Sequence, residues 1–584
     1  MDHDCIPALL IGGDRMEIRT FPKDMSTFEI SRTNPASCLV SGLFSESVRI
    51  RDTERKFYTY LTPGLAYNRP CLVVAPPADT DIQEMMENSF WKEFADRNRI
   101  FLHILAAENR TWNEDGSDAD YMNQVYIRIQ ARQAYVTMQD NIYACGIGSG
   151  SVIAQQAVMS MSSEWSGLAT FGDMNENALK NADTVHGSEN TGKTELSINA
   201  AKVQVPVWMF ISENSGANAS VCRYWQKQND SDPEVFSNAW ADEIYFPSSV
   251  NKQSSLNEEK ISEVRITNGY DGNLSEEAMS KVWEFLAENC RHRGFGHKML
   301  RKRMDPEKYG FTYHETEHGG FTRRWYEYVP ESAKDNAPLV VCMHGRGGTA
   351  ESFISLSGMS RVAEERGFIT VFPEACVYQQ RPGGLRNILL WNGFYEDEKT
   401  DDTGFILKMI DDVKSRHSID ETRIYACGQS SGGMMTSRLA LDAPEVFAAV
   451  SPWSAIIDPD HELVLPESIE PAVPYMFLFG DKDWLCTDRE NGKLEYHVVK
   501  DIAAFLENLM KLYELDTTPY SYVCGEITYY VYFNRNHVPM LVVGNVKDMT
   551  HANYPRESWI AYDEFLCRYS KLKDGTLLYM GRPA

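Results

Sequence analysis

The segment Ile424–Leu441 reads IYACGQSSGGMMTSRLAL, and an earlier segment, Ile142–Met159, reads IYACGIGSGSVIAQQAVM. Both begin with the residues IYACG, an apolar run typical of a buried strand, and both continue through a glycine-containing turn into helical spacing. The later copy carries Ser430 in the turn Gly-Gln-Ser-Ser-Gly, whereas Gly148 occupies the matching position of the earlier copy. The pattern predicts a strand–turn–helix unit twice, with a nucleophile only in the later copy.

Further segments repeat in the same order along the chain. The matched pairs are ERKFYTYLTPGLAYNRPCLVVAPP with TRRWYEYVPESAKDNAPLVVCMHG, EFADRNRIFLHIL with VAEERGFITVFPE, VPVWMFISENS with VPYMFLFGDKD, and KVWEFLAENC with AYDEFLCRYS. We therefore predict two tandem copies of one domain, over residues 1–305 and 306–584. The basic stretch RHRGFGHKMLRKRMDPEKYG near 300–315 is interpreted as a helix end and linker between them.

Each copy alternates short β-branched runs with amphipathic segments. CLVVA, NIYACG and VPVWMFI in the first copy, and PLVVCMH, RIYACG and VPYMFLF in the second, are typical of buried parallel strands. SVIAQQAVMSM, GMMTSRLALD and DTGFILKMIDDVKS have helical periodicity. The alternation predicts the α/β class, with mostly parallel sheets flanked by helices.

Charge and hydropathy exclude some partners. The 584-residue chain has a formal net charge of −26, which argues against a nucleic-acid or anionic-membrane partner, since both need a basic surface. No apolar run reaches the roughly 18 residues that span a bilayer. The oligomeric state stays open, and self-association is compatible with the sequence.

The cysteines and the N-terminal sequence indicate the cellular compartment of the protein. The twelve cysteines include several within apolar runs, such as Cys71 and Cys342, and no spacing typical of a zinc site occurs. We expect no metal and no cofactor. The N-terminal sequence has no basic segment before a long apolar one, so it does not resemble a signal peptide, and a reduced, cytoplasmic protein is expected.

Three residues of the second copy have the order of a serine-hydrolase triad. Ser430 lies at a strand-to-helix turn, where a strained backbone exposes the hydroxyl. A base must accept its proton, and His551, in VKDMTHANYP after the strand-like PMLVVG, is the candidate. Asp483, after FLFG, is the candidate acid that orients the imidazole; Asp481 is the alternative, and as a solvated turn residue it is the weaker one.

A glycine-rich loop follows the strand PLVVCM. It reads His344-Gly345-Arg346-Gly347-Gly348, and we call residues 344–348 the HGRGG loop. A tetrahedral intermediate needs preorganised donors for its oxyanion. The backbone N–H groups of Arg346 and Ser431 are the candidates, and His344 is a candidate for substrate contact.

The first copy lacks each of these groups. Aligning the repeats places Gly148 opposite Ser430, Ser215 opposite Asp483, approximately Asp271 opposite His551, and Pro77-Ala78 opposite His344-Gly345. The first copy is therefore predicted to keep the fold without a catalytic site.

The second copy resembles the polyhydroxybutyrate-depolymerase-like and feruloyl or acetylxylan esterase group of α/β-hydrolases. The resemblance rests on RRWYEYVP, PLVVCMHGRGGTAESF, the pair Trp391-Asn392, IYACGQSSGGMMTSRLALDAPEVFAAVSPWS, FLFGDKD and MTHANYP. It implies carboxylic-ester hydrolysis without a metal, with Ser430 as nucleophile, His551 as base and Asp483 as acid. It also implies that Trp391 lies beside the site, although core packing is an equal alternative.

The candidate catalytic residues are compatible with several functions. A serine esterase acting on a small-molecule or aryl ester is the main hypothesis, and aromatic residues such as Trp484 suit such a substrate. A serine peptidase and an acyltransferase would use the same groups. For the first copy, a non-catalytic binding or scaffolding module is the alternative.

Overall fold

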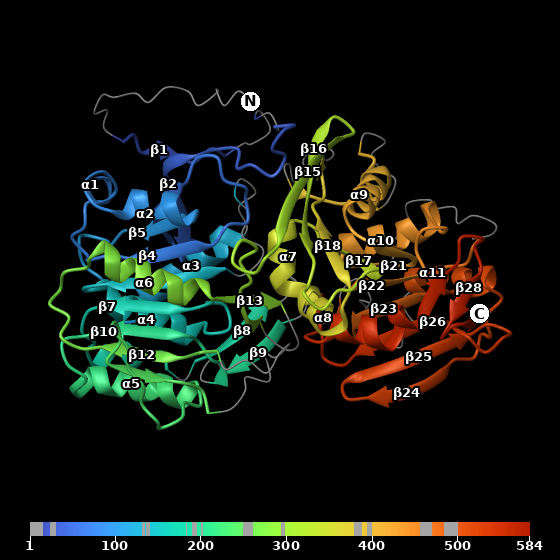
Figure 1. The fold of residues 1–584 in the computed structure, drawn as a ribbon. Helices are drawn as coiled ribbons and strands as arrows, with labels where there is room; N and C mark the ends of the chain where they lie inside the picture. The colour runs from blue at the N-terminus through green and yellow to red at the C-terminus, as the bar shows by residue number, and fades with distance from the viewer. Residues whose placement is uncertain are drawn as a thin grey trace.

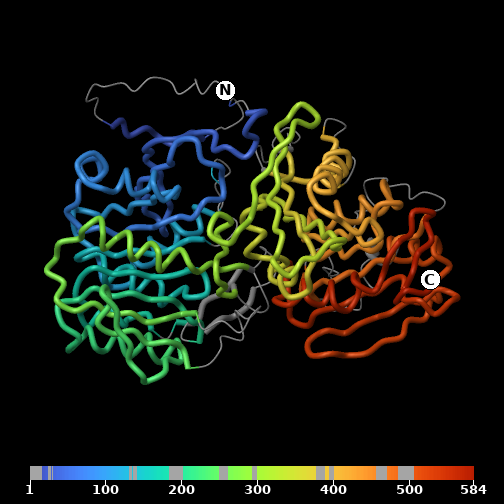
Figure 2. The backbone as a smooth tube through the Cα atoms, in the orientation of Figure 1, coloured from blue at the N-terminus to red at the C-terminus, as the bar shows by residue number. Residues whose placement is uncertain are grey.

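Two ten-stranded sheets, one in each half of the chain, form the framework of the protein (Figure 1). The computed structural model describes residues 16–23, 28, 31–130, 135, 141–182, 184–189, 195–199, 202–248, 261–293, 298–378, 388–393, 400–455, 470–483 and 500–584. Figure 2 shows the two halves side by side, with the first from blue to green and the second from yellow to red.

The first sheet has the strand order β1-β2-β3-β5-β4-β6-β7-β10-β12-β11. Its strands are β1 (Arg19–Thr20), β2 (Gly42–Ile50), β3 (Thr53–Leu61), β4 (Cys71–Ala75), β5 (Phe101–Leu105), β6 (Ile142–Ile147), β7 (Leu168–Phe171), β10 (Val207–Phe210), β11 (Glu243–Tyr245) and β12 (Val264–Thr267). Its helices are α1 (Ile82–Glu87), α2 (Trp91–Asn98), α3 (Ser117–Gln130), α4 (Gly150–Ser160), α5 (Gly216–Gln228) and α6 (Glu276–Ala287). β8 (Val185–Glu189) and β9 (Glu195–Asn199) form a separate hairpin.

The second sheet has the order β15-β16-β18-β17-β21-β22-β23-β26-β25-β24. Its strands are β15 (Thr312–His318), β16 (Phe321–Tyr328), β17 (Ala337–Met343), β18 (Ile369–Pro373), β21 (Ile419–Gln429), β22 (Ala449–Trp453), β23 (Tyr475–Gly480), β24 (Tyr520–Cys524), β25 (Ile527–Phe533) and β26 (Pro539–Val546). The helices include α7 (Ala350–Ser357), α8 (Met359–Arg366), α9 (Asp402–Arg416), α10 (Ser431–Asp442), α11 (Lys500–Leu512) and α12 (Glu557–Trp559), which continues into a π-helix at Ile560–Phe565. Short strands β19 (Val377–Tyr378) and β20 (Ile388–Leu389) pair with each other, and β27 (Tyr569–Lys571), β28 (Leu577–Tyr579) and β29 (Arg582–Pro583) form a small sheet near the C-terminus.

The two sheets share one connectivity. When the outer strands β1 and β24 are set aside, the remaining strands follow each other in the same order, and equivalent neighbours have the same relative direction. Strands β5, β4, β6, β7, β10 and β12 run parallel, as do β18, β17, β21, β22, β23 and β26. The predicted α/β class with mostly parallel sheets is confirmed.

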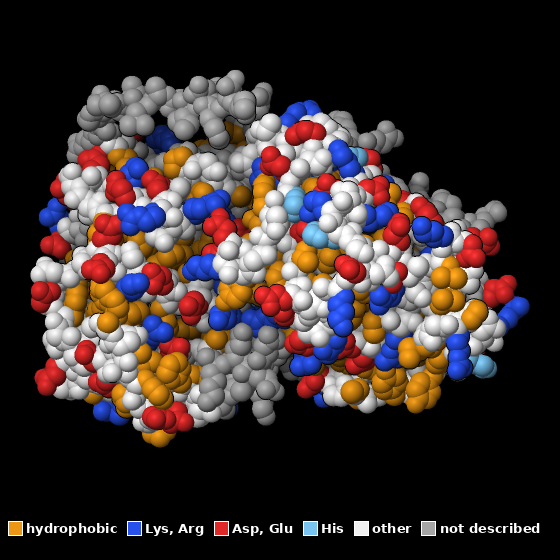
Figure 3. Space-filling view, in the orientation of Figure 1, with side chains coloured by type: hydrophobic (Ala, Val, Ile, Leu, Met, Phe, Trp, Pro, Cys, Tyr) orange, Lys and Arg blue, Asp and Glu red, His pale blue; other side chains and the backbone are white. Residues whose placement is uncertain are grey.

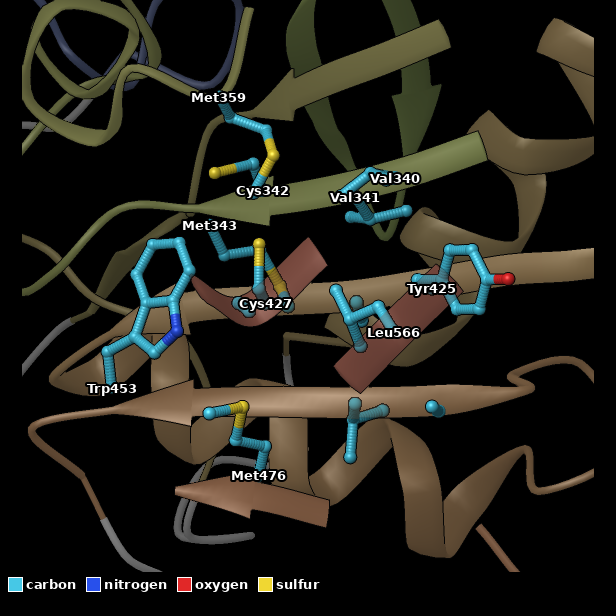
Figure 4. Close-up of a cluster of buried hydrophobic side chains, with 14 of the residues drawn as sticks. Val340, Val341, Cys342, Met343, Met359, Tyr425, Cys427, Trp453, Met476 and Leu566 are labelled. Carbon is cyan, nitrogen blue, oxygen red and sulfur yellow. The ribbon is translucent and has the colours of Figure 1, made fainter. Parts of the chain in front are cut away.

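Alternating side chains of the central strands fill the two faces of each sheet. In β4, Cys71 and Val73 point into a core with α3, α4 and α5, whereas Leu72 and Val74 point into another with α1, α2 and α6. This follows from the two-residue period of a strand. In the second half, Figure 4 shows residues such as Val340, Cys427 and Trp453 packed around the central strands.

The predicted linker between the halves is instead an ordered hairpin. β13 (Asn289–Arg293) pairs antiparallel with β14 (Lys298–Lys302) directly after α6. Arg291 and Arg301 of this hairpin are 1% and 3% exposed. Arg291 donates to the carbonyl oxygens of Trp165 and Gln204, and Arg301 to that of Leu356, so these residues form a packed hairpin instead of the predicted helix end and linker. Sequence charge alone does not show that backbone carbonyls will satisfy buried guanidinium groups.

On the face drawn in Figure 3, acidic and basic side chains are interspersed over both halves. In the described part of the chain, no helix combines the length and the apolar character that crossing a membrane requires.

Candidate active site

Ser430 lies at the turn between β21 and α10 with φ 54° and ψ −120°, a conformation that L-residues rarely adopt. The flanking glycines make the turn sterically feasible. A Cβ on Gly432 would lie 2.3 Å from the carbonyl oxygen of Met343, and one on Gly428 would lie 2.7 Å from the same atom. The Gly-x-Ser-x-Gly spacing is therefore required by contact with the neighbouring strand β17.

The structure brings Ser430, His551 and Asp483 into one hydrogen-bonded chain. His551 Nε2 lies 2.9 Å from Ser430 Oγ, and His551 Nδ1 lies 3.1 and 3.0 Å from the two carboxylate oxygens of Asp483. Asp483 is fully buried, and the side chain of His551 is 12% exposed. The carboxylate favours the tautomer with the proton on Nδ1, in which Nε2 can accept a proton from the serine hydroxyl.

Asp481, the alternative acid, occupies a different environment. Its backbone N–H donates to the carbonyl oxygen of Val546 at 2.9 Å, and burial raises the pKa of its carboxyl. The carboxylate that meets the imidazole is that of Asp483.

Backbone hydrogen bonds join the loops that carry the acid and the histidine. The N–H of Lys482 donates to the carbonyl oxygen of Met549 at 2.8 Å, and Asp483 N–H closes a turn onto Gly480 at 3.1 Å. A Cβ on Gly480 would lie 2.0 Å from the Met549 carbonyl oxygen, so the close approach of the two loops requires glycine there. These contacts fix the relative position of Asp483 and His551.

Two further side chains, which the sequence did not indicate, hold the histidine loop. Ser454, at the end of β22, donates its hydroxyl to the carbonyl oxygen of Ala552 at 3.0 Å. The carboxyl group of Glu557 accepts from the amide of Asn553 and, at 3.0 Å, from the N–H of Tyr554. Burial raises the pKa of Glu557 to about 8. Ser454 acts on a loop about a hundred positions away, and Glu557 acts on residues shortly before it, so neither residue belongs to a recognisable motif.

The HGRGG loop lies against the serine. A Cβ on Gly345 would lie 3.4 Å from Ser430 Cβ. As the first residue of α10, Ser431 has a backbone N–H without a partner inside the helix. The structure thus places the loop of Arg346 and the N-terminus of α10 at the nucleophile, where donors to an oxyanion are needed.

His344, the candidate for substrate contact, is 1% exposed and braces the HGRGG loop. Its Nε2 accepts the N–H of Ala375 at 3.0 Å, so its Nδ1 carries the proton and donates to the carbonyl oxygen of Gly345 at 2.7 Å. Burial lowers the pKa of His344 to about 4, and the ring is therefore neutral at pH 7.

Three further residues are predicted from the sequence to lie at the site: Trp391, Arg346 and Trp484. Trp391 is 1% exposed and donates its indole N–H to the carbonyl oxygen of His344 at 2.9 Å, so its buried ring supports the same loop. The side chain of Arg346 is exposed. Trp484 lies outside the described residues.

The first half has the same turn without the same groups. Gly148 has φ 52°, close to that of Ser430, and a Cβ on it would lie 3.4 Å from Cγ of Pro77. Ser215, which the sequence aligns with Asp483, directly precedes α5. Asp271 is aligned with His551 and caps a local turn by accepting the N–H of Asn273 at 2.9 Å. In the described residues, no three His, Cys, Asp or Glu side chains gather as a metal site would need.

Comparisons with known proteins give similar sequences in the second half. The chain is 34% identical over 136 residues to feruloyl esterase B of Thermothelomyces thermophilus, covering 22% of this chain and 43% of that protein. It is 36% identical over 130 residues to poly(3-hydroxyalkanoate) depolymerase C of Paucimonas lemoignei, covering 22% of this chain and 30% of that protein. The chain thus spans less than half the length of these curated relatives.

Among solved structures, an acetyl xylan esterase from Aspergillus awamori matches with a TM-score of 0.33 at 16% identity. The match covers 43% of this chain and 98% of that chain.

The predicted cytoplasmic location is wrong, because the relatives are secreted, extracellular esterases and depolymerases. The prediction relied partly on cysteines within strands. Cys71, Cys342 and Cys427 are buried within strands β4, β17 and β21, where they pack as small side chains of the core. Such packing is independent of the redox compartment, so it gave no information on location.

Residues 324–464 match the family model of the Esterase PHB depolymerase domain. The matched range contains the HGRGG loop, Trp391 and Ser430, whereas Asp483 and His551 follow it. The second half of the chain therefore contains an Esterase PHB depolymerase domain.

Proposed function

We propose that the protein is a serine carboxylic-ester hydrolase whose catalytic residues are Ser430, His551 and Asp483. The observation that carries the proposal is the hydrogen-bonded chain from Asp483 through His551 to Ser430, with distances of 3.0 and 2.9 Å. The strained backbone of Ser430 and the adjacent HGRGG loop support it, and so do the names of the relatives, which denote ester hydrolases.

The geometry supports a two-step mechanism. Ser430 Oγ attacks the ester carbonyl carbon while His551 Nε2 accepts its proton, and Asp483 stabilises the resulting imidazolium. The backbone N–H groups of Arg346 and Ser431 donate to the oxyanion of the tetrahedral intermediate. The intermediate collapses when the alcohol leaves with the proton from Nε2. Water, activated by the same nitrogen, then hydrolyses the acyl-enzyme and regenerates the serine.

The substrate is proposed to be a small-molecule or aryl ester. The relatives' names include a feruloyl esterase and a poly(3-hydroxyalkanoate) depolymerase, which place aromatic and hydroxyacyl esters among the classes to test. A panel of p-nitrophenyl, hydroxycinnamoyl and 3-hydroxybutyryl esters would rank them. Aminoacyl anilides test the peptidase alternative, and an added alcohol acceptor tests acyl transfer.

The decisive experiment compares the native protein with Ser430→Ala. We expect loss of ester turnover by about 10⁴-fold or more, together with loss of covalent labelling by a fluorophosphonate probe. Ser431→Ala is the matched control, because its backbone N–H is retained. Turnover by Ser430→Ala within about a hundredfold of the native rate would disprove the assignment.

We further infer that residues 1–305 are a second copy of the fold of residues 306–584 and that this copy is not catalytic. The common order of the nine matching strands in each sheet supports the first point. Gly148, Ser215 and Asp271 in place of a nucleophile, acid and base support the second.

A further inference from the structure

A side chain of the first half belongs to the core of the second. Tyr67 follows β3 in the first half, yet its ring packs in the hydrophobic core that is formed mainly by residues of the second half. Its backbone is anchored in the first half, because its N–H donates to the carbonyl oxygen of Ala36 at 2.8 Å. Tyr67 is 2% exposed, and burial raises its pKa well above the ordinary value, so the hydroxyl is neutral.

Two hydrogen bonds connect Tyr67 to the HGRGG loop. The hydroxyl oxygen of Tyr67 accepts the N–H of Leu389 at 2.5 Å. The carbonyl oxygen of Leu389 in turn accepts the N–H of Gly347 at 2.9 Å. Gly347 follows Arg346 directly and has φ 73°. A single residue, Leu389, therefore transmits the position of Tyr67 to the middle of the loop.

An ion cluster at the start of α7 makes a second connection. Arg69 of the first half and Arg303, after the hairpin, contact the carboxylate of Glu351 at 2.5 and 3.0 Å. Glu351 lies in the first turn of α7, which begins two residues after the HGRGG loop. Burial alone would raise the pKa of Glu351, but Arg69 and Arg303 lower it below its ordinary value. The carboxylate is therefore ionised at pH 7 and held by both guanidinium groups.

Arg301 fixes the opposite end of the same helix. Its guanidinium donates to the carbonyl oxygen of Leu356, in the last turn of α7, where carbonyl groups lack helical partners. The first half and the hairpin thus act at three places: on the middle of the HGRGG loop through Leu389, on the start of α7 and on its end.

We propose that Tyr67 is a positioning residue of the active site and that the first half acts on catalysis by holding the HGRGG loop in the conformation that binds the oxyanion. This inference rests on the proposed esterase function. Without the hydroxyl of Tyr67, the buried N–H of Leu389 loses its acceptor. Segment 388–389 then shifts or binds water, and the N–H of Arg346 loses its alignment with the oxyanion.

The test compares Tyr67→Phe with Tyr60→Phe. Tyr60 is a matched control, because it is also 2% exposed and its hydroxyl donates to Asp96 within the first half at 2.8 Å. For both variants, kcat and KM for p-nitrophenyl acetate are measured per active site titrated with a fluorophosphonate. Inhibition by an alkylboronic acid, which forms a tetrahedral adduct on the serine, reports the oxyanion contacts in a stable complex.

We expect Tyr67→Phe to lower kcat by roughly tenfold with KM nearly unchanged, since displacing an oxyanion donor affects mainly the transition state. Affinity for the boronic acid should fall by a similar factor, and Tyr60→Phe should change neither quantity. If Tyr67→Phe lowers only the number of titratable sites, with kcat per site equal to that of Tyr60→Phe, the residue is merely structural and the proposal is wrong. If the native protein neither hydrolyses esters nor takes the probe, the proposed function itself fails, and this inference with it.

Discussion

Gly148 and Ser430 have nearly the same backbone φ, 52° and 54°, at the equivalent turns of the two halves. Glycine adopts positive φ without a steric penalty, whereas serine does not. Both halves therefore keep the turn conformation. Only the second half has a residue with a side chain at this position, Ser430, and this side chain lowers the stability of the fold. Strain of this kind is of the order of 1–3 kcal/mol per residue.

The strain predicts opposite effects of small substitutions at the two turns. Ser430→Gly should be about 1 kcal/mol more stable to urea than Ser430→Ala, because both lack the hydroxyl and only the alanine keeps the strained Cβ. Gly148→Ala should destabilise by about 1 kcal/mol for the same reason. Equal midpoints for Ser430→Gly and Ser430→Ala would show that the turn is not strained.

The position of Asp483 predicts a difference between two neighbouring aspartates. Asp483→Asn should lower kcat by several orders of magnitude, because an amide can hold the wrong imidazole tautomer and cannot stabilise the imidazolium. Asp481→Asn is the control, and it should retain kcat within a few fold. Fluorophosphonate labelling rates give an independent readout. A larger loss in Asp481→Asn than in Asp483→Asn would reverse the assignment of the acid.

His344 predicts loss of stability in acid. Its pKa is about 4 in the folded protein, below the value of 6.5 for an unperturbed histidine. Between these values the unfolded chain binds a proton that the folded one does not, so the free energy of unfolding falls as the pH decreases from 6.5 to 4. The slope from this residue approaches about 1.4 kcal/mol per pH unit in that window.

The measurement is urea unfolding between pH 4 and 7 for the native protein and for His344→Gln. The variant should be less stable at pH 7 and should show a shallower decline in acid. His537→Asn, at an exposed position, serves as the control and should keep the native slope. Parallel curves for the native protein and His344→Gln would contradict a buried neutral imidazole.

The repeated strand–turn–helix segment allowed the α/β class and the candidate triad to be predicted from sequence. The GQSSG turn requires glycines because β17 passes close to it, and these glycines can be recognised in the sequence. Asp483 and His551 could be proposed because each follows a strand, and parallel strands end at one edge of the sheet.

Contacts between distant segments could not be predicted in the same way. Tyr67 and Leu389 are 322 positions apart, and nothing in either local sequence indicates the other. The basic residues near 300 are interpreted from the sequence as a helix end and linker because they follow the last helix of the first copy, yet Arg301 is buried and donates to the carbonyl oxygen of Leu356 in α7. His344 suggested a substrate contact by its place beside the glycines, but both ring nitrogens are used by the backbone.

The Arg69–Glu351 pair predicts measurable coupling between the two halves. Side-chain exposures of 12% and 25% mean that both groups are partly desolvated, so their interaction is stronger than that of a surface pair. We expect Arg69→Gln and Glu351→Gln each to destabilise the protein by about 2 kcal/mol, since each leaves a charge with fewer partners. Arg303 keeps a contact with Glu351 when Arg69 is changed, which limits the loss.

A double-mutant cycle isolates the pair, with free energies of unfolding from urea titration. The coupling energy should be about 1–2 kcal/mol for Arg69 and Glu351. The exposed pair Lys281–Glu284 is the control, with side-chain exposures of 39% and 59%, and should give at most about 0.5 kcal/mol. If the two cycles give the same coupling, the Arg69–Glu351 pair does not hold the first half against α7.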